Sequence, residues 1–274
     1  MRLPEKIFLS LNRNLRCILS DCATGIWQEY VLPLKVQNCK QNAIRSISKA
    51  TAELLSPENR NRCVECMKRA PNVGNQLKQR VDESRFAAVL IAVCIDPQNV
   101  EASILYTRRS ANLSRHTRQI SFPGGLKDEA DADFVECALR ETEEEIGLPR
   151  HRVEVWGTGS LLTPPRTAAI TPVLGTIRNF NLSNLKLNPS EVDEAFTLPI
   201  QRLVAPESFH YTQFKSGYSL PVFVFERYKL WGITAYLTNV FLNCFVEPSS
   251  KICNFILILY LIIPKKFNSV TENG

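Results

Sequence analysis

The stretch from Phe122 to Leu148 constrains this chain more than any other, because a sharp turn leads directly into an acidic, apolar-periodic segment. Pro123-Gly124-Gly125 is incompatible with the interior of a helix or strand, since proline lacks a backbone donor and glycine favours turns. Asp128, Asp131 and Asp133 then precede the apolar-periodic positions. Acidic residues placed there cap free N–H groups and complement the helix dipole, so they predict a helix start.

A helix is therefore expected after Asp133. Its buried stripe would be supplied by apolar residues, which are Phe134, Cys137, Ala138 and Leu139. Gly147 is expected to end it, because a helix commonly closes with a residue in the left-handed conformation.

Three carboxylates of this segment are expected to share one helix face. Glu141, Glu144 and Glu145 are related by steps of three and four residues. Hard carboxylate oxygens gathered this closely suit Mg²⁺ or Mn²⁺, which also bridge to substrate phosphates. Arg140 is placed to hold one of the carboxylates in position. The alternative for a glutamate run alone is an acidic, solvated helix face.

Taken together, these residues resemble the Nudix box, a loop–helix–loop pattern written G-x5-E-x7-R-E-U-x-E-E-x-G-U, where U is a bulky apolar residue. The segment Arg140–Leu148 matches its last nine positions except that Thr142 stands at an apolar one. Asp131 takes the place of the first glutamate, and the gap from there to Arg140 is one residue longer. This longer form is similar to the coenzyme A diphosphatase branch of the superfamily.

The segment before the turn carries a second resemblance to that branch, whose pattern is L-L-T-x-R-S-x3-R-x3-G-x3-F-P-G-G. Leu105–Ser110 and Phe122–Gly125 match its two ends. Ser114 stands where the branch has arginine, although Arg115 beside it can take that role, and Arg118 stands where the branch has glycine. Arginines upstream of such a site are natural phosphate ligands, and surface arginines on a loop are the alternative.

The resemblance implies an α/β protein with the Nudix fold, an α/β/α sandwich around a mixed β-sheet. It implies Mg²⁺- or Mn²⁺-dependent hydrolysis of coenzyme A or acyl-coenzyme A to 3′,5′-ADP and (acyl-)4′-phosphopantetheine. The alternatives are a Nudix hydrolase of another nucleoside diphosphate derivative, such as ADP-ribose or a capped or dinucleotide substrate, and a catalytically silent Nudix-fold binding module.

The site residues follow from the same resemblance. The catalytic residues are Glu144, Glu141 and Arg140; the metal ligands are Glu141, Glu145 and Glu144; the substrate contacts are Arg109, Arg115, Gly124 and Gly125. Glu191 or Glu194 could supply a further ligand or base, and helix capping with a solvated acidic turn is the plainer interpretation of that pair.

Composition limits the other classes of function. The net charge of +6 over 274 residues suits an anionic substrate and would also suit nucleic acid, so it decides neither. No long Lys/Arg block or basic patch with interleaved aromatic residues indicates nucleic-acid binding. The nine scattered cysteines predict reduced thiols in an intracellular compartment. Cys63 and Cys66 form a lone C-x-x-C without the further ligands a zinc site requires, so ordinary free cysteines are favoured.

Four regions are expected along the chain. Residues 1–55 form an N-terminal extension, and its basic, acid-poor, amphipathic character predicts a mitochondrial transit segment, with a disordered or partly helical extension and a cytosolic or peroxisomal protein as alternatives. Residues 56–84 form a helical lead-in that begins at Ser56-Pro57 and runs through Lys68. Residues 85–242 form the Nudix domain. Residues 243–274 form an apolar tail whose run Phe255–Ile263 is too short to span a membrane.

Strands are expected where short, β-branched apolar runs occur. The expected strands cover residues 87–95, 102–107, 153–157 and 168–175, and a hairpin from residues 220–225 and 229–235 should enter a final helix. Pro172 suggests an edge or bulge position for its strand.

Overall fold

The computed structural model describes residues 51–70, 86–96, 101–113, 117–164, 167–213 and 219–246. Almost all of the predicted extension, the position of Arg115 and the apolar run Phe255–Ile263 lie outside the described residues. Within the described ranges, no helix has the length and apolar character needed to cross a membrane.

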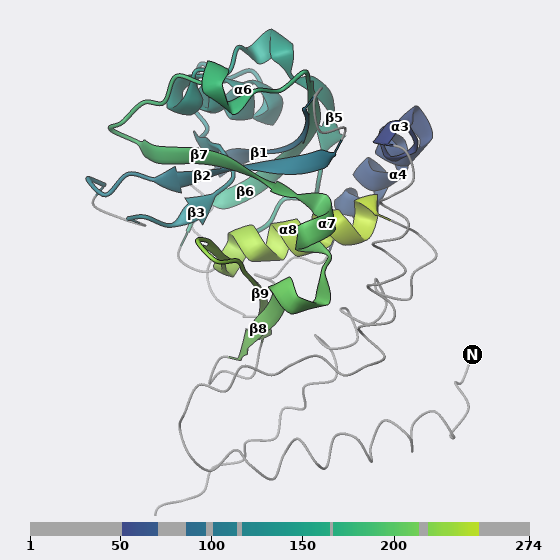
Figure 1. Ribbon diagram of the computed structural model, residues 1–274. Coiled ribbons are helices and arrows are strands. Elements are labelled where there is room, and N and C mark those ends of the chain that lie inside the picture. Colours follow the sequence, from purple (N-terminus) through teal and green to yellow (C-terminus); the bar gives the residue numbers. More distant parts are fainter. Residues whose placement is uncertain are drawn as a thin grey trace, which may run out of the picture. The chain divides into compact units, whose positions relative to one another are not determined.

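A mixed sheet of seven strands forms the centre of the described domain (Figure 1). The strands are β1 (Phe86–Ile95), β2 (Ala102–Arg109), β3 (Ile120–Ser121), β4 (Gly124–Leu126), β5 (Glu154–Thr158), β6 (Ala169–Arg178) and β7 (Val192–Pro199). Their order is β3-β2-β1-β6-β5, with β4 also paired to β1 and β7 to β2. The β1–β6 pair is parallel and the other pairs are antiparallel.

Helices cover both faces of this sheet, which confirms the predicted α/β/α sandwich. The helix α6 (Phe134–Ile146) lies on one face, and α4 (Pro57–Lys68) and α8 (Gly232–Phe245) lie on the other (Figure 1). Each face has its own apolar cluster, and β1 contributes to both. A strand buried on both faces needs apolar side chains at successive positions, which explains the unbroken run of residues 87–95.

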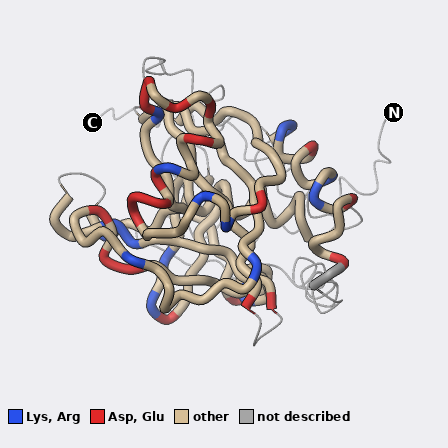
Figure 2. The backbone as a smooth tube through the Cα atoms, turned by 90° about the horizontal axis from the view of Figure 1, so that it is seen from above, with Lys and Arg blue, Asp and Glu red and all other residues tan. Residues whose placement is uncertain are grey.

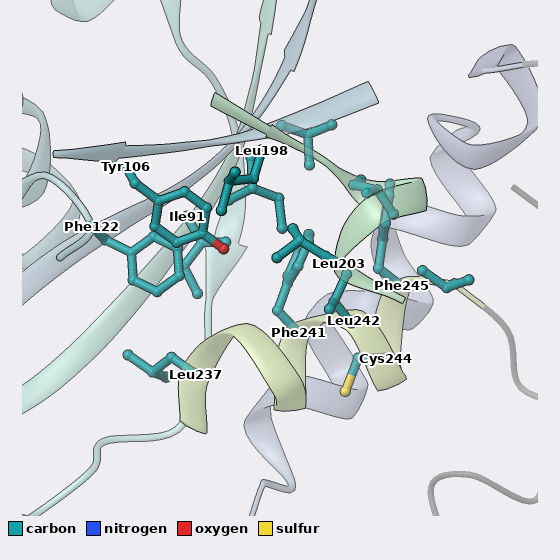
Figure 3. Packing of buried hydrophobic residues seen from close by; sticks show 14 of the residues in the cluster. Ile91, Tyr106, Phe122, Leu198, Leu203, Leu237, Phe241, Leu242, Cys244 and Phe245 are labelled. Atoms are coloured by element: carbon teal, nitrogen blue, oxygen red, sulfur yellow. The ribbon is translucent and has the colours of Figure 1, made fainter. Parts of the chain in front are cut away.

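The cluster on the α4 and α8 face contains most of the large side chains. Figure 3 shows Tyr106 and Phe122 from the sheet side packed near Leu237 and Phe241 of α8. The Tyr106 hydroxyl reaches Thr238 Oγ1 at 3.0 Å, so its polar atom is satisfied inside the core.

The start of α4 is as predicted. Ser56 caps it by accepting a hydrogen bond from Asn59 N at 3.2 Å, and Pro57 is the first helical residue. The prediction of reduced thiols was wrong for Cys66, which forms a disulfide with Cys244 at the far end of α8. The two residues are separated by 178 positions, and a sequence spacing of this length carries no signal for pairing.

The hairpin predicted before the last helix is confirmed, and it belongs to a small second sheet. This sheet has the order β10-β9-β8, with β8 (Phe209–Gln213), β9 (Ser219–Val224) and β10 (Lys229–Leu230). The strand β8 was not predicted. The remaining elements are α3 (Thr51–Leu54), α7 (Ile200–Leu203) and three 3-10 turns, η1 (Arg150–Arg152), η2 (Leu182–Asn184) and η3 (Pro206–Ser208).

Pro172 does not mark an edge strand, because β6 lies between β1 and β5. Its carbonyl accepts a hydrogen bond from Gly159 N at 2.8 Å, so the backbone of residue 172 points to the β5 side. The ladder with β5 ends at the pair Thr158–Val173. The missing N–H of the proline therefore falls just beyond that ladder, which is why a central strand tolerates it.

Candidate active site

The prediction that Gly124 and Gly125 lie in a turn was wrong, because they form the short strand β4, where the missing side chains let it pack closely against its neighbours. Gly124 has a φ of 142°, and a Cβ added there would lie 2.2 Å from the Ala88 carbonyl oxygen of β1. A Cβ at Gly125 would lie 2.2 Å from the Glu141 carboxylate. The glycine pair thus lets β4 lie directly against β1 and the Glu141 carboxylate of α6.

The caps of α6 follow the predicted local chemistry. Asp133 accepts a hydrogen bond from Glu136 N at 2.8 Å, and Gly147 adopts the left-handed conformation with φ of 65°. Thr142, the polar residue at an apolar position, is buried and donates to Ala138 O at 2.6 Å. Its hydroxyl is therefore satisfied within the helix.

Glu145 is the buried member of the acidic group, with 3% of its surface exposed. Its Oε2 accepts a hydrogen bond from Gly124 N at 3.2 Å. The pKa of Glu145 is raised to about 8, chiefly by burial and to a smaller extent by the charges of Glu141 and Glu191. The Gly124 N–H and the charge of Arg109 act in the opposite direction. The ionised form of this carboxylate is therefore costly unless positive charge is brought to it.

Glu141 and Glu144 lie progressively closer to solvent. Glu141 is partly buried, and that burial raises its pKa, while the hydrogen bond from Arg140 lowers it. The Glu144 side chain is 52% exposed and accepts from Arg140 Nη1 at 3.0 Å. On the shared helix face, the carboxylates therefore range from buried Glu145 through partly buried Glu141 to exposed Glu144.

Arg140 links the turn to the helix. Its Nε and Nη2 bond the two oxygens of Asp131 at 2.8 and 2.9 Å, and its Nη1 bonds Glu141 at 2.9 Å. The Leu126 carbonyl accepts from Nη2 at 3.1 Å. The Arg140 guanidinium holds the pKa of buried Asp131 well below its usual range. Asp131 therefore occupies the place of the missing glutamate and orients Arg140.

Arg109 and Glu191 approach the same carboxylates from the sheet side. Arg109 ends β2, its charge acts on Glu145, and its Nε is buried without a hydrogen-bond partner among the described residues. Glu191 O accepts from Ser110 N at 2.8 Å, and Asn188 N donates to Glu145 O at 2.9 Å. The segment before β7 is therefore fastened to both β2 and α6.

Of the acidic pair considered in the sequence, only Glu191 comes near α6. Glu194 lies within β7 and forms an ion pair with Arg108 at 3.1 Å, so the interpretation as a solvated acidic turn was wrong for it.

Arg118 has a φ of 57°, the left-handed region, at the position where the branch pattern has glycine. Figure 2 shows acidic and basic residues interspersed along the described backbone.

The donor chemistry fits a hard divalent cation, because the charges of Glu141 and Glu191 act on buried Glu145, whose printed hydrogen bond comes from a backbone N–H. In the conformation described, no three Asp, Glu, His or Cys side chains of the described ranges are arranged closely enough to hold a metal ion. Glu141 and Glu144 are instead turned to Arg140.

A mixed sheet between helices, with a glycine-containing strand beside an acidic helix, is the architecture of the Nudix hydrolases. The family model described as NUDIX domain matches residues 85–216. A mitochondrial coenzyme A diphosphatase of Mus musculus, NUDT8, is 37% identical over 204 residues, which cover 71% of this chain and 93% of that protein. The Homo sapiens protein of the same name is 42% identical over 158 residues, covering 56% and 66%.

A bacterial relative from Photorhabdus laumondii, an uncharacterized Nudix hydrolase named NudL, is 35% identical over 161 residues, which cover 58% of this chain and 83% of that protein. The chain belongs to the Nudix family and falls in its coenzyme A diphosphatase-like branch. It is accordingly a hydrolase of the Nudix diphosphatase type.

Proposed function

We propose that this chain hydrolyses the diphosphate of coenzyme A or acyl-coenzyme A, with Mg²⁺ or Mn²⁺, to 3′,5′-ADP and (acyl-)4′-phosphopantetheine. The single observation that carries the proposal is the buried Glu145 with Arg109 beside it. The carboxylates there favour a cation, and the unpartnered guanidinium nitrogen favours an anion. A cation-bound diphosphate satisfies both, and the names of the mammalian relatives supply the substrate class.

Each side chain has a role in this proposal. Glu141 and Glu145 would hold the cation, and Glu144 would act as a further ligand or as the base that takes the water proton. Glu191 is a second candidate for either role, because its charge acts on the same two carboxylates. Mg²⁺ or Mn²⁺ held there would neutralise the diphosphate and acidify the attacking water.

The remaining residues bind and orient. Arg109 would hold a diphosphate oxygen, and Arg115, outside the described residues, would assist it. Gly124 and Gly125 would leave the backbone of β4 open to the substrate, and Arg140 would fix Glu141 and Glu144 in orientation. Hydrolysis of a diphosphate requires the protein to position both the base that activates water and the phosphorus atom that the water attacks.

The test is a substrate panel with product masses determined in Mg²⁺ and in Mn²⁺. We expect coenzyme A and an acyl-coenzyme A to give 3′,5′-ADP faster than ADP-ribose or dinucleoside polyphosphates give their products. Glu145→Gln should abolish turnover. Glu143→Gln is the matched control, because Glu143 lies on the same helix but bonds Arg150 at the surface.

The alternatives give different results in this panel. Faster turnover of ADP-ribose or a dinucleotide would assign the chain to another Nudix substrate. Binding of coenzyme A without turnover, equal in the wild type and Glu145→Gln, would identify a silent binding module.

We also propose that the protein acts in mitochondria, as the printed names of its mammalian relatives and the basic, acid-poor sequence of residues 1–55 suggest. Residues 1–55 fused to a fluorescent reporter should direct it to mitochondria. A reporter that stays cytosolic or enters peroxisomes would contradict this assignment.

A further inference from the structure

Ser121 lies on the α6 face of the sheet, although its two neighbours in the chain face the other way. Ile120 and Phe122 both belong to the apolar cluster on the α8 face, and Figure 3 shows Phe122 beside Tyr106 on that side. Side chains alternate along a strand, so Ser121 between them points to the face that α6 covers. Ser121 is partly exposed, whereas both neighbours are buried.

The pairing of β3 with β2 agrees with this placement. Ser121 lies directly opposite Thr107, and directly opposed residues share a face. Leu105 belongs to the cluster under α6, so alternation along β2 puts Thr107 and Arg109 on that face too. The charge of Arg109 acts on Glu145 of α6, which is independent evidence for the same face.

Ser121 is also near the candidate active site along the chain and across the sheet. The Gln119 carbonyl accepts a hydrogen bond from Arg109 N at 3.0 Å, so Ser121 is the diagonal neighbour of Arg109 in the β2–β3 pair. Diagonal neighbours lie roughly 7–8 Å apart, within reach of a long side chain. Three residues after Ser121, Gly124 N donates to the Glu145 carboxylate. Ser121 therefore lies beside the arginine that is expected to bind an anion.

Thr107 holds the Ser121 hydroxyl. The two hydroxyl oxygens are 3.2 Å apart, and the Ser121 carbonyl oxygen lies 3.4 Å from the Thr107 hydroxyl. Thr107 is fully buried, and a buried donor needs an acceptor, so the Thr107 proton is directed to Ser121. Donation to the Ser121 hydroxyl, which is the shorter contact, leaves the proton of Ser121 free to point away from Thr107.

We propose that Ser121 is a substrate-binding residue that donates its hydroxyl proton to a diphosphate oxygen held by Arg109, and that Thr107 positions this hydroxyl. An anion beside Ser121 favours the arrangement in which Thr107 donates to Ser121 and Ser121 donates to the anion, because hydrogen bonds in a chain polarise one another. The proposal rests on the proposed function in naming the diphosphate as the ligand.

The first experiment compares steady-state kinetics of Ser121→Ala with the wild type. Alanine removes the donor but keeps the backbone carbonyl of residue 121 as an acceptor for Thr107, so the fold should be retained. We expect KM for the diphosphate substrate to rise about tenfold, the order for loss of one hydrogen bond to a charged group, with kcat changed less than about threefold. An unchanged KM, or a fall in kcat alone, would overturn the proposal.

Two further variants separate the hydroxyl from its surroundings. Ser121→Thr keeps the hydroxyl, so its KM should stay within about threefold of the wild type. Ser103→Ala is the matched control, because Ser103 lies opposite Cys94 on the same α6 face but about 13 Å along β2 from Thr107. Its KM should be unchanged. A rise in KM as large as that of Ser121→Ala in this control would refute the assignment.

A double-mutant cycle tests the positioning role of Thr107. Thr107→Val removes the hydroxyl that holds Ser121, while Ser121 can still donate, so KM should rise by only about threefold. In Thr107→Val combined with Ser121→Ala, KM should equal that of Ser121→Ala alone, because Thr107 acts through the Ser121 hydroxyl. A lower Tm with unchanged KM in Thr107→Val, or effects on KM that multiply in the double variant, would overturn the positioning role.

Calorimetric titration with ADP and Mg²⁺ separates this proposal from the proposed function, because ADP carries a diphosphate without the pantetheine arm. We expect ADP to bind about tenfold more weakly to Ser121→Ala than to the wild type, whether or not coenzyme A is hydrolysed. Weaker binding to the variant without turnover of coenzyme A would refute only the proposed function. Equal ADP affinity in the two proteins, or no binding of ADP to the wild type, would overturn the assignment of Ser121.

Discussion

Replacement of Glu145 by glutamine should stabilise the metal-free protein at alkaline pH. The pKa of Glu145 is raised from 4.5 to about 8 in the folded state. Below pH 4.5 the Glu145 carboxyl is protonated in both the folded and the unfolded state, so it adds nothing to the pH dependence of the free energy of unfolding. As the pH rises from 4.5 to about 8, the unfolded state releases a proton that the native state retains, so the free energy of unfolding falls. The fall is complete above about pH 8.

The size of this effect follows from the shift itself. A difference of about 3.5 pKa units corresponds to about 5 kcal/mol, an upper limit because the helix can relax around the charge. Glu145→Gln keeps the acceptor for Gly124 N–H and removes the titration. In EDTA the variant and the wild type should therefore be equally stable near pH 4.5, and the variant should be more stable at pH 8.5.

Urea unfolding at fixed ionic strength, at both pH values and with EDTA or Mg²⁺, measures these differences. Mg²⁺ at a hundredfold excess over its dissociation constant should add about 2.7 kcal/mol to the wild type and much less to the variant. Glu143→Gln should show neither effect, because Glu143 is exposed. An identical pH profile for Glu145→Gln and the wild type, or equal stabilisation of both by Mg²⁺, would refute the reasoning.

Three further predictions concern the disulfide between α4 and α8, the loop before β3 and the strand β4. Reduction of the Cys66–Cys244 disulfide, which spans 178 positions, should lower the free energy of unfolding by about 5 kcal/mol and Tm by roughly 10–15 °C. Calorimetry with and without reductant measures this difference. The Tm of Cys66→Ser should not change when reductant is added. Arg118→Gly should raise stability by about 0.5–1 kcal/mol in urea, because glycine adopts a φ of 57° without strain, whereas Arg118→Ala should not. Gly125→Ala should lower kcat/KM by about 10- to 100-fold with little change in Tm, because its Cβ displaces only the mobile end of Glu141.

The elements that were predicted correctly depend on chemistry within a few residues. Asp133 and Gly147 bound α6 as expected, since a cap bonds a backbone group three or four positions away. Ser56 and Pro57 begin α4 for the same reason. The β-branched run of β1 is equally local, because burial on both faces requires apolar residues at every position. The residues that determine these helix ends and this strand lie next to one another in the sequence, so the elements can be predicted from it.

Features that depend on distant partners were not predicted. Cys66 meets Cys244 only because α4 and α8 pack on the same face of the sheet. Pro172 was expected at an edge or a bulge, and it lies in a central strand next to an irregular pairing with β5, whose ladder stops one residue short of it. Neither fact follows from the residues around these positions, since each depends on where another segment ends.

The pair Glu191 and Glu194 shows why the site itself was only partly predictable. A three-residue spacing does not determine which of the two approaches α6, because one extra residue in the strand exchanges the faces. That extra residue is Asp193, which has no partner on β2 and whose carboxylate accepts a hydrogen bond from Ala111 N. The helix that carries the acidic residues could be located from its own sequence, but the residues opposite it depend on the register of β7. Substitutions that shift this register should therefore alter substrate affinity without touching any carboxylate of α6.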